Sequence, residues 1–203
     1  MKIICVGRNY VDHIKELNNK RPDSPVIFLK PETSIINKKQ PFFIPNFSKD
    51  IQYEVEVLVK INKLGKAISP QFSHKYYNDI GLGIDFTARD LQNKLKKNGL
   101  PWEKSKAFDG SALIGKWLNK SEIKDLKSIN FNLEKNGKIV QEGITSKMLW
   151  NIDELISEIS KYFTLKIGDI IFTGTPSGVG RVEENDILIG RINQKECFSI
   201  KIK

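Results

Sequence analysis

Short apolar segments bounded by polar or turn-forming residues recur along most of the 203-residue chain and predict β-strands. The expected strands are Lys2–Val6, Val26–Leu29, Ile51–Ile61, Asp79–Ile84, Ala112–Trp117, Ile129–Glu134, Lys138–Glu142, Asp169–Thr173, Asp186–Ile192 and Cys197–Ile202. Asn136 and Gly137 separate two of these segments, and both tolerate the positive φ of a type I′ turn, so they predict a tight hairpin. The pattern therefore indicates a mainly β protein.

Three other segments have helical periodicity: Tyr10–Asn18, Ala88–Lys97 and Ile152–Tyr162. The third follows a candidate N-cap, Asn151, and its apolar positions fall on one face. Because helices do not alternate regularly with strands, we expect an α+β fold, a mixed β-roll or distorted barrel with a few flanking helices. No linker-like stretch divides the chain, so residues 1–203 are expected to form one domain.

The chain is basic, with 33 Lys and Arg against 24 Asp and Glu, a net charge of +9 and a pI near 9.4. The lysines are spread along the chain, without a basic helix or an aromatic-basic repeat that would favour nucleic acid. We expect the surface to attract small anionic substrates instead of nucleic acid. A basic, non-catalytic module that binds polyanions remains the alternative, and a steep salt dependence of DNA binding would favour it.

Two further features concern location and redox chemistry. No apolar stretch approaches the roughly 20 residues of a membrane-spanning helix, and Met1–Cys5 leads into a strand and not a secretory leader. We therefore expect a soluble, cytoplasmic protein without a membrane partner. Cys5 and Cys197 lie in strand-like segments without a ligand spacing, which favours two buried thiols over a disulfide or metal site.

Three acidic residues carry the strongest chemical signal. Glu54 and Glu56 alternate along one predicted strand and project to the same side, and Asp85 ends a second apolar strand. A Glu-x-Glu strand taken alone is more often a hydrated sheet face, but a carboxylate that enters buried surroundings needs a partner or a metal. Three carboxylates without nearby Cys or His suit Mg²⁺ or Mn²⁺, with water or substrate oxygens completing about six ligands.

His13 and Glu16 lie three residues apart in a predicted helix, which places both on one face within side-chain reach. A carboxylate bonded to one imidazole nitrogen fixes the tautomer, so the other nitrogen can take a proton from water. The pair is thus a candidate base and its orienting group, and the alternative is an ordinary surface helix.

Six sequence fragments, in order, resemble one known family. They are Val6-Gly7-Arg8-Asn9-Tyr10 with His13 and Glu16; Pro25-Val26-Ile27-Phe28-Leu29-Lys30-Pro31; Tyr53-Glu54-Val55-Glu56; Asp85-Phe86-Thr87-Ala88-Arg89-Asp90-Leu91-Gln92; Gly99-Leu100-Pro101-Trp102 with Lys106 and Phe108-Asp109-Gly110; and Thr173-Gly174-Thr175-Pro176-Ser177-Gly178-Val179-Gly180. The chain resembles the fumarylacetoacetate hydrolase family nearly end to end, close to its single-domain acylpyruvase and oxaloacetate decarboxylase branch. The resemblance implies the roll of that family's C-terminal domain and a homodimer.

The resemblance also implies roles for individual residues. It implies that Glu54, Glu56 and Asp85 bind Mg²⁺ or Mn²⁺. It also implies that His13 and Glu16 form the family's His–Glu dyad, on a segment that becomes ordered over bound ligand, and that Lys106 is the active-site lysine. It places Arg8, Lys30, Gln92 and Thr175 around the substrate. The residues alone favour a solvated loop around Lys106, leave Lys30 open as an ordinary strand-end lysine, and favour a structural ion pair for Arg89 or Asp90.

The implied reaction is metal-dependent cleavage of a carbon–carbon bond in a small anionic 2-oxo acid. For an acylpyruvate, His13 would activate water to give pyruvate and a carboxylic acid, whereas decarboxylation of oxaloacetate needs no water. The alternative within the family is an isomerase or hydratase of unsaturated keto-dicarboxylic acids from aromatic degradation, and the dyad favours cleavage. Two departures from the family pattern are Lys116, where a proline is common, and the short polar stretch Asn18–Ser24 of the expected lid.

Overall fold

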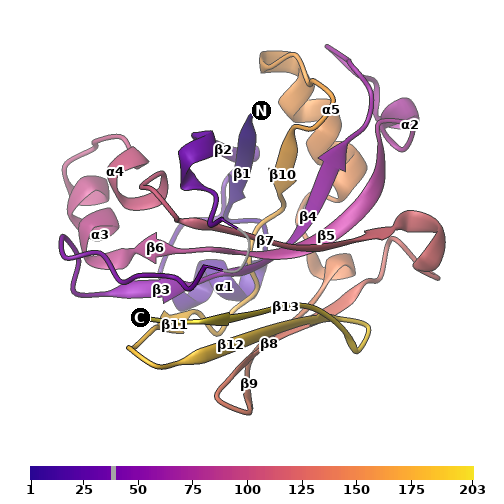
Figure 1. Cartoon of the computed structure of the whole chain (residues 1–203). Coiled ribbons are helices and arrows are strands. Elements are labelled where there is room, and N and C mark those ends of the chain that lie inside the picture. Colours follow the sequence, from indigo (N-terminus) through magenta and orange to yellow (C-terminus); the bar gives the residue numbers. More distant parts are fainter. Residues whose placement is uncertain (38–39) are drawn as a thin grey trace.

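The computed structural model of the chain describes residues 1–37 and 40–203, and strands dominate it (Figure 1). The strands are β1 (Ile3–Gly7), β2 (Val26–Lys30), β3 (Ile51–Tyr53), β4 (Val55–Ile61), β5 (Tyr77–Asp85), β6 (Thr87–Ala88), β7 (Ala112–Asn119), β8 (Asn130–Lys135), β9 (Lys138–Ile144), β10 (Ile170–Phe172), β11 (Gly180–Arg181), β12 (Ile187–Ile192) and β13 (Lys195–Lys201). The helices are α1 (Val11–Glu16), α2 (Pro70–Ser73), α3 (Arg89–Lys97), α4 (Glu103–Lys106) and α5 (Ile152–Tyr162), with short 3₁₀ turns at Glu32–Ser34, Lys120–Glu122 and Thr145–Lys147.

The strands form three sheets. The largest has the order β2-β1-β10-β4-β5-β7, in which β1 and β10 are parallel and the other neighbours are antiparallel. A four-stranded antiparallel sheet, β13-β12-β8-β9, lies beneath β5 and β7 (Figure 1). Buried aliphatic and aromatic side chains fill the space between the layers, among them Ile80, Leu82, Leu133, Leu188 and Phe198. Their removal from water is the main favourable term that holds the layers together.

The third sheet, β11-β3-β6, continues the main sheet at one end. The β4–β5 ladder pairs Val55 with Ile84, the β3–β6 ladder pairs Gln52 with Thr87, and the backbone N–H of Asp85 donates to the carbonyl of Glu54 at 2.9 Å between them. One antiparallel ladder therefore passes from one sheet to the next at Glu54. The single strand predicted over residues 51–61 is accordingly two strands, because the chain changes sheets there.

The mainly β roll with flanking helices is confirmed. Each sheet of the described residues is an open series of strands, so the distorted barrel is not the form that the roll takes. Helices α3 and α4 contact each other beside β6, and α2 contacts α5 at the opposite end (Figure 1). The three expected helices are present, with α1 shorter than predicted and α2 and α4 not foreseen.

Several local predictions are also confirmed. Asn136 and Gly137 have φ of 51° and 81°, as a type I′ hairpin turn requires. Asn151 caps α5 in a capping box with Glu154, which satisfies two backbone N–H groups at the helix start. Both cysteines are buried and free.

None of the helices in the described parts of the chain is long and apolar enough to cross a membrane.

Candidate functional site

The three acidic residues meet where the ladder passes between the sheets. Glu54 lies between β3 and β4, Glu56 is in β4, and Asp85 ends β5. All three are buried, and one carboxylate oxygen of each lies within 4.8 Å of those of the others. An oxygen-only set of this kind can hold a hard divalent cation and leaves room for ligand oxygens.

Lys106 lies directly against two of these carboxylates. Its Nζ atom is 2.7 Å from Glu54 Oε2, 2.8 Å from Asp85 Oδ2 and 2.6 Å from the Thr87 hydroxyl oxygen. The lysine comes from the single helical turn of α4, which packs against α3 and β6. Lys106 is therefore a buried cation of the acidic centre and not part of the solvated loop that local composition favours.

Lys30, at the end of β2, supports the centre from a second direction. Its Nζ atom lies 2.8 Å from Asp85 Oδ1 and donates to the Ser111 hydroxyl at 2.9 Å and to the Lys106 carbonyl. The side chain is fully buried, with 2% of the residue exposed. These contacts hold Asp85 between two ammonium groups, which offsets the cost of burying its charge.

Arg89, the first residue of α3, pairs with the remaining oxygen of Glu54. Its other nitrogens donate to Gln92 Oε1 at 2.6 Å and to Gln52 Oε1 at 2.8 Å. The structural ion pair expected near the start of this helix is thus one between Arg89 and Glu54. Gln92 is placed beside the acidic centre through the same guanidinium.

The electrostatic surroundings separate the proton affinities of the two glutamates. Burial alone would raise the pKa of Glu54, but Lys106 and Arg89 outweigh it and hold that pKa well below its usual value. Burial raises the pKa of Glu56 well above normal, and the charges of Asp85 and Glu54 add to this rise. The centre therefore holds one firmly ionised carboxylate beside one that readily keeps a proton.

The loop after β10 packs against Glu56 and borders the acidic centre on that side. The backbone N–H of Gly174 donates to Glu56 Oε2 at 2.6 Å, and Gly174 has a φ of +99° that favours glycine. The Thr175 hydroxyl donates to the Val55 carbonyl at 2.9 Å and accepts from Gln141 Nε2 at 2.9 Å. Thr175 thus borders the cleft with its hydroxyl already bonded to the protein.

His13 and Glu16 form a hydrogen-bonded pair on α1. His13 Nδ1 and Glu16 Oε2 are 3.0 Å apart, and Glu16 Oε1 accepts from the backbone N–H of Gly178 at 2.9 Å. Burial would raise the pKa of Glu16, but the bonds from His13 and Gly178 lower it. An ionised Glu16 therefore fixes the imidazole against the loop that closes the acidic centre.

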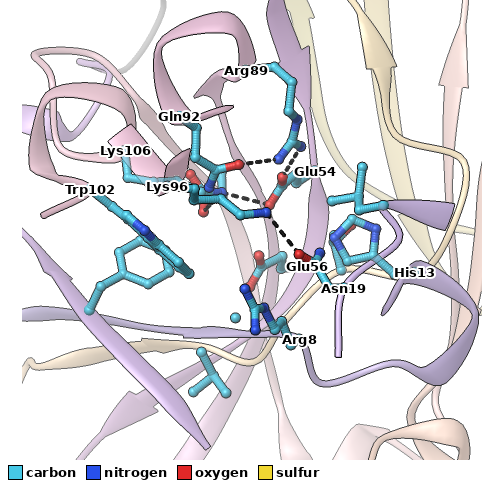
Figure 2. A pocket seen from close by; sticks show the side chains of 16 residues that line it. Arg8, His13, Asn19, Glu54, Glu56, Arg89, Gln92, Lys96, Trp102 and Lys106 are labelled. Carbon is cyan, nitrogen blue, oxygen red and sulfur yellow. Dashed lines mark hydrogen bonds and ion pairs between the residues drawn. The ribbon is translucent and has the colours of Figure 1, made fainter. Parts of the chain in front are cut away.

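These groups surround one cleft, and Figure 2 shows their side chains converging on it. Its lining comprises Val6, Gly7, Arg8, His13, Leu17, Asn19, Phe28, Glu54, Glu56, Asp85, Arg89, Gln92, Lys96, Trp102, Lys106 and Thr175. Eight of the ten predicted site residues belong to this lining. The other two, Glu16 and Lys30, lie just behind it, where Glu16 bonds to His13 and Lys30 pairs with Asp85.

Sequence reasoning did not assign Arg89 to the acidic centre, nor Lys96 and Asn19 to the cleft. Lys96 follows Gln92 by four residues, so one helix face carries both, and this spacing is a signal that could have found the lysine. Asn19 lies in the polar stretch after α1 and accepts from Lys96 Nζ at 2.8 Å. This contact joins two segments that are 77 residues apart, so local patterns did not indicate it.

An acidic centre buried in a β-roll, beside a His–Glu pair in the same cleft, defines an enzyme that can combine a divalent cation with acid–base chemistry. Residues 2–198 match the family described as fumarylacetoacetate (FAA) hydrolase C-terminal. The chain belongs to the fumarylacetoacetate hydrolase family.

Relatives with established names cover almost the whole chain. Oxaloacetate tautomerase FAHD1, mitochondrial, from Bos taurus is 42% identical over 201 residues, which are 99% of this chain and 91% of the relative. Oxaloacetate decarboxylase, mitochondrial, from Dictyostelium discoideum is 40% identical over 188 residues, 92% of this chain and 86% of the relative. The crystal structure of fumarylpyruvate hydrolase from Pseudomonas aeruginosa in complex with Mn²⁺ and pyruvate has a TM-score of 0.93 and 31% identity, covering 100% of this chain and 89% of that one.

Proposed function

We propose that the protein is a divalent-cation-dependent enzyme that cleaves a carbon–carbon bond in small 2-oxo acids. It would hydrolyse acylpyruvates to pyruvate and a carboxylic acid, and decarboxylate oxaloacetate. The observation that carries this proposal is the buried trio of carboxylates, with oxygens within 4.8 Å of one another, in the same cleft as the His13–Glu16 pair. Relatives named for oxaloacetate decarboxylation and fumarylpyruvate hydrolysis support it.

Glu54, Glu56 and Asp85 would hold the cation, which we propose to be Mg²⁺ or Mn²⁺ because the ligands are all carboxylate oxygens. The Mn²⁺ in the Pseudomonas aeruginosa relative supports this choice. When bound, the cation supplies a Lewis acid that stabilises the negative charge of an enolate. Arg89 and Lys106 offset the charge of the carboxylates that surround it.

His13 would act as the base in hydrolysis. With Glu16 accepting the Nδ1 proton, Nε2 is left as an acceptor that can take a proton from water. The hydroxide then adds to the distal acyl carbonyl, the carbon–carbon bond breaks, and its electron pair passes to the enolate of pyruvate, which takes up a proton. Oxaloacetate reaches the same enolate by losing carbon dioxide without water.

A second activity, tautomerisation of oxaloacetate, is favoured by the name of the bovine relative. It interconverts the keto and enol forms by moving one proton between carbon and oxygen, so it needs the same stabilisation of an enolate and a base within reach. His13 and the acidic centre would serve this reaction without bond cleavage.

A direct assay tests the proposal. The purified protein is incubated with Mg²⁺ or Mn²⁺ and with acetylpyruvate or oxaloacetate; pyruvate is followed through lactate dehydrogenase, and enol oxaloacetate by its ultraviolet absorbance. We expect pyruvate from at least one acid. Loss of the enol signal without any pyruvate would favour the tautomerase, and no change in either signal with the cation bound would contradict both activities.

Calorimetry tests the assignment of the ligands. We expect Glu54→Gln and Asp85→Asn to abolish the heat of Mn²⁺ binding, because each removes one of three anionic ligands. Glu103→Gln, at an exposed position at the start of α4, is the matched control and should bind Mn²⁺ as the wild type does. Retained affinity in either ligand variant would contradict the assignment.

We further propose a homodimer that works in the cytoplasm. The family resemblance is the basis for the dimer, and sedimentation velocity at micromolar concentration tests it by the mass of the species. Two relatives have names that place them in mitochondria, so cell fractionation with an antibody against this chain is the test of location. Recovery in an organelle fraction would overturn the cytoplasmic assignment.

A further inference from the structure

Two cations of the cleft, Arg8 and Lys96, have no carboxylate within ion-pair distance among residues 1–37 and 40–203. The other cations at the centre each contact a carboxylate. Lys96 Nζ donates to the neutral oxygen of Asn19 at 2.8 Å, and the Arg8 guanidinium lies 6.0 Å from the centre of the Trp102 ring. In the part of the chain that the structure describes, the cleft thus presents two positive charges without a carboxylate partner.

Both side chains are half-buried and belong to the cleft lining, and Figure 2 shows them with Asn19 in front of the acidic residues. Arg8 follows β1 with a φ of +59°, a conformation that a residue with a side chain seldom adopts. Backbone strain of this kind is retained where the surrounding structure fixes a functional side chain. Lys96 reaches the same cleft from the Gln92 face of α3.

The electrostatic surroundings of Lys96 suit an anionic ligand. Burial lowers its pKa, and the positive charges of Arg8 and Arg89 lower it further. An anion bound between Arg8 and Lys96 would relieve this repulsion. An ammonium carries three N–H donors, and Asn19 uses one, so further donors remain for ligand oxygens.

We propose that Lys96, together with Arg8, binds a second carboxylate of the substrate and so selects 2-oxo acids with two carboxylates over those with one. The inference rests on the proposed function, and it takes the first carboxylate and the 2-oxo group of the substrate to face the acidic centre. Lys96 is then a specificity-determining residue at the far end of the substrate. A charge-assisted hydrogen bond between ammonium and carboxylate would supply the discrimination.

The experiment compares two acylpyruvates that differ in charge: acetylpyruvate has one carboxylate and fumarylpyruvate has two. We expect Lys96→Met to lower kcat/KM for fumarylpyruvate about tenfold more than kcat/KM for acetylpyruvate, mainly through KM. An equal loss with both acids, or no loss with either, would overturn the proposal.

Binding of the same two acids to the Mn²⁺-loaded protein, measured by calorimetry, gives the comparison without turnover. If the wild type releases no pyruvate from either acid, the hydrolase proposal fails. The ratio of the two dissociation constants, in wild type and in Lys96→Met, then decides the role of Lys96 alone. An unchanged ratio would overturn it.

Three variants separate this role from a structural one. Lys97→Met removes an exposed charge on the same helix and should leave the substrate ratio unchanged. Asn19→Ala removes the amide partner; if Lys96 acted only by holding the segment after α1, this variant would reproduce the change in ratio and contradict the proposal. Lys96→Arg keeps the charge and should restore part of the preference for two carboxylates.

Discussion

The ammonium group of Lys106 lies 2.8 Å from Asp85 Oδ2, and both side chains are buried. Burial lowers the pKa of Lys106, but the charges of Asp85 and Glu54 outweigh it and raise that pKa above its usual value. Lys106 therefore stays charged and neutralises part of the acidic centre. A divalent cation at the three carboxylates would share this task with the lysine.

Lys106→Met should destabilise the cation-free protein by about 3 kcal/mol, because it leaves buried carboxylates with fewer partners. Mn²⁺ should raise the melting temperature of the variant more than that of the wild type, since the cation replaces the lost charge and meets less repulsion. Thermal unfolding with and without Mn²⁺ measures both effects. Lys104→Met, which removes an exposed lysine of the same helix, is the control. Equal Mn²⁺ shifts in wild type and Lys106→Met would contradict the prediction.

His13→Gln should separate the two cleavage reactions. Without the base, kcat for acetylpyruvate hydrolysis should fall by about a hundredfold to ten-thousandfold, since no group takes the proton from water. Decarboxylation of oxaloacetate needs no water and should fall by less than about tenfold. Pyruvate release from each acid measures the two rates, and similar losses in both would place His13 in a step that the reactions share.

Gly174→Ala should destabilise the protein through its backbone. Gly174 has a φ of +99°, and an added Cβ would lie 2.8 Å from Asn9 Cβ and 3.1 Å from the Val6 carbonyl oxygen. We expect a loss of about 2 kcal/mol or more in urea unfolding. Gly168→Ala is the matched control, since its φ is +90° but nothing lies within 4 Å of the new Cβ. If both variants lose the same stability, the close approach to Asn9 has no effect.

Asp186 predicts a pH-dependent contribution to stability. Burial raises its pKa, but bonds from Lys135, the Glu183 N–H and Asn136 outweigh it and lower that pKa. Because the folded pKa lies below the unfolded value of about 3.9, the contribution is fully present above that value and is lost as pH falls through the folded pKa. Asp186→Asn should therefore be less stable than wild type by about 1 kcal/mol at pH 7, with the difference shrinking towards pH 3.

Urea midpoints between pH 7 and pH 3 measure this dependence. Asp23→Asn, at an exposed carboxylate, should show no comparable difference from the wild type. A difference for Asp186→Asn that stays constant across this range would contradict the assignment.

Local sequence patterns predicted the parts of the site that depend on short-range geometry. Strand alternation placed Glu54 and Glu56 on one side, and helical spacing paired His13 with Glu16; the carboxylates meet within 4.8 Å and the dyad atoms within 3.0 Å. These features depend on short-range backbone geometry, which the periodicity of apolar residues indicates. Most strands were predictable for the same reason.

Features that depend on distant segments were not predictable in this way. Lys106 lies in a lysine-rich stretch, and only its contacts with residues 21 and 52 positions away make it a buried cation. The break at Glu54 had no local signal either, because β3 and β4 look like one strand until their partners are known. The family resemblance supplied Lys106, but the Arg89–Glu54 pair came from the structure.

The ladder that changes sheets at Glu54 also has a thermodynamic consequence. A ligand that binds Glu54, Glu56 and Asp85 together would stabilise the junction between the main sheet and β11-β3-β6. Local opening of that junction would require release of the ligand. Hydrogen-exchange protection of β3 and β6 would therefore rise as the bound fraction of the protein rises. The same residues that serve the chemistry would thereby control how often this end of the roll opens locally.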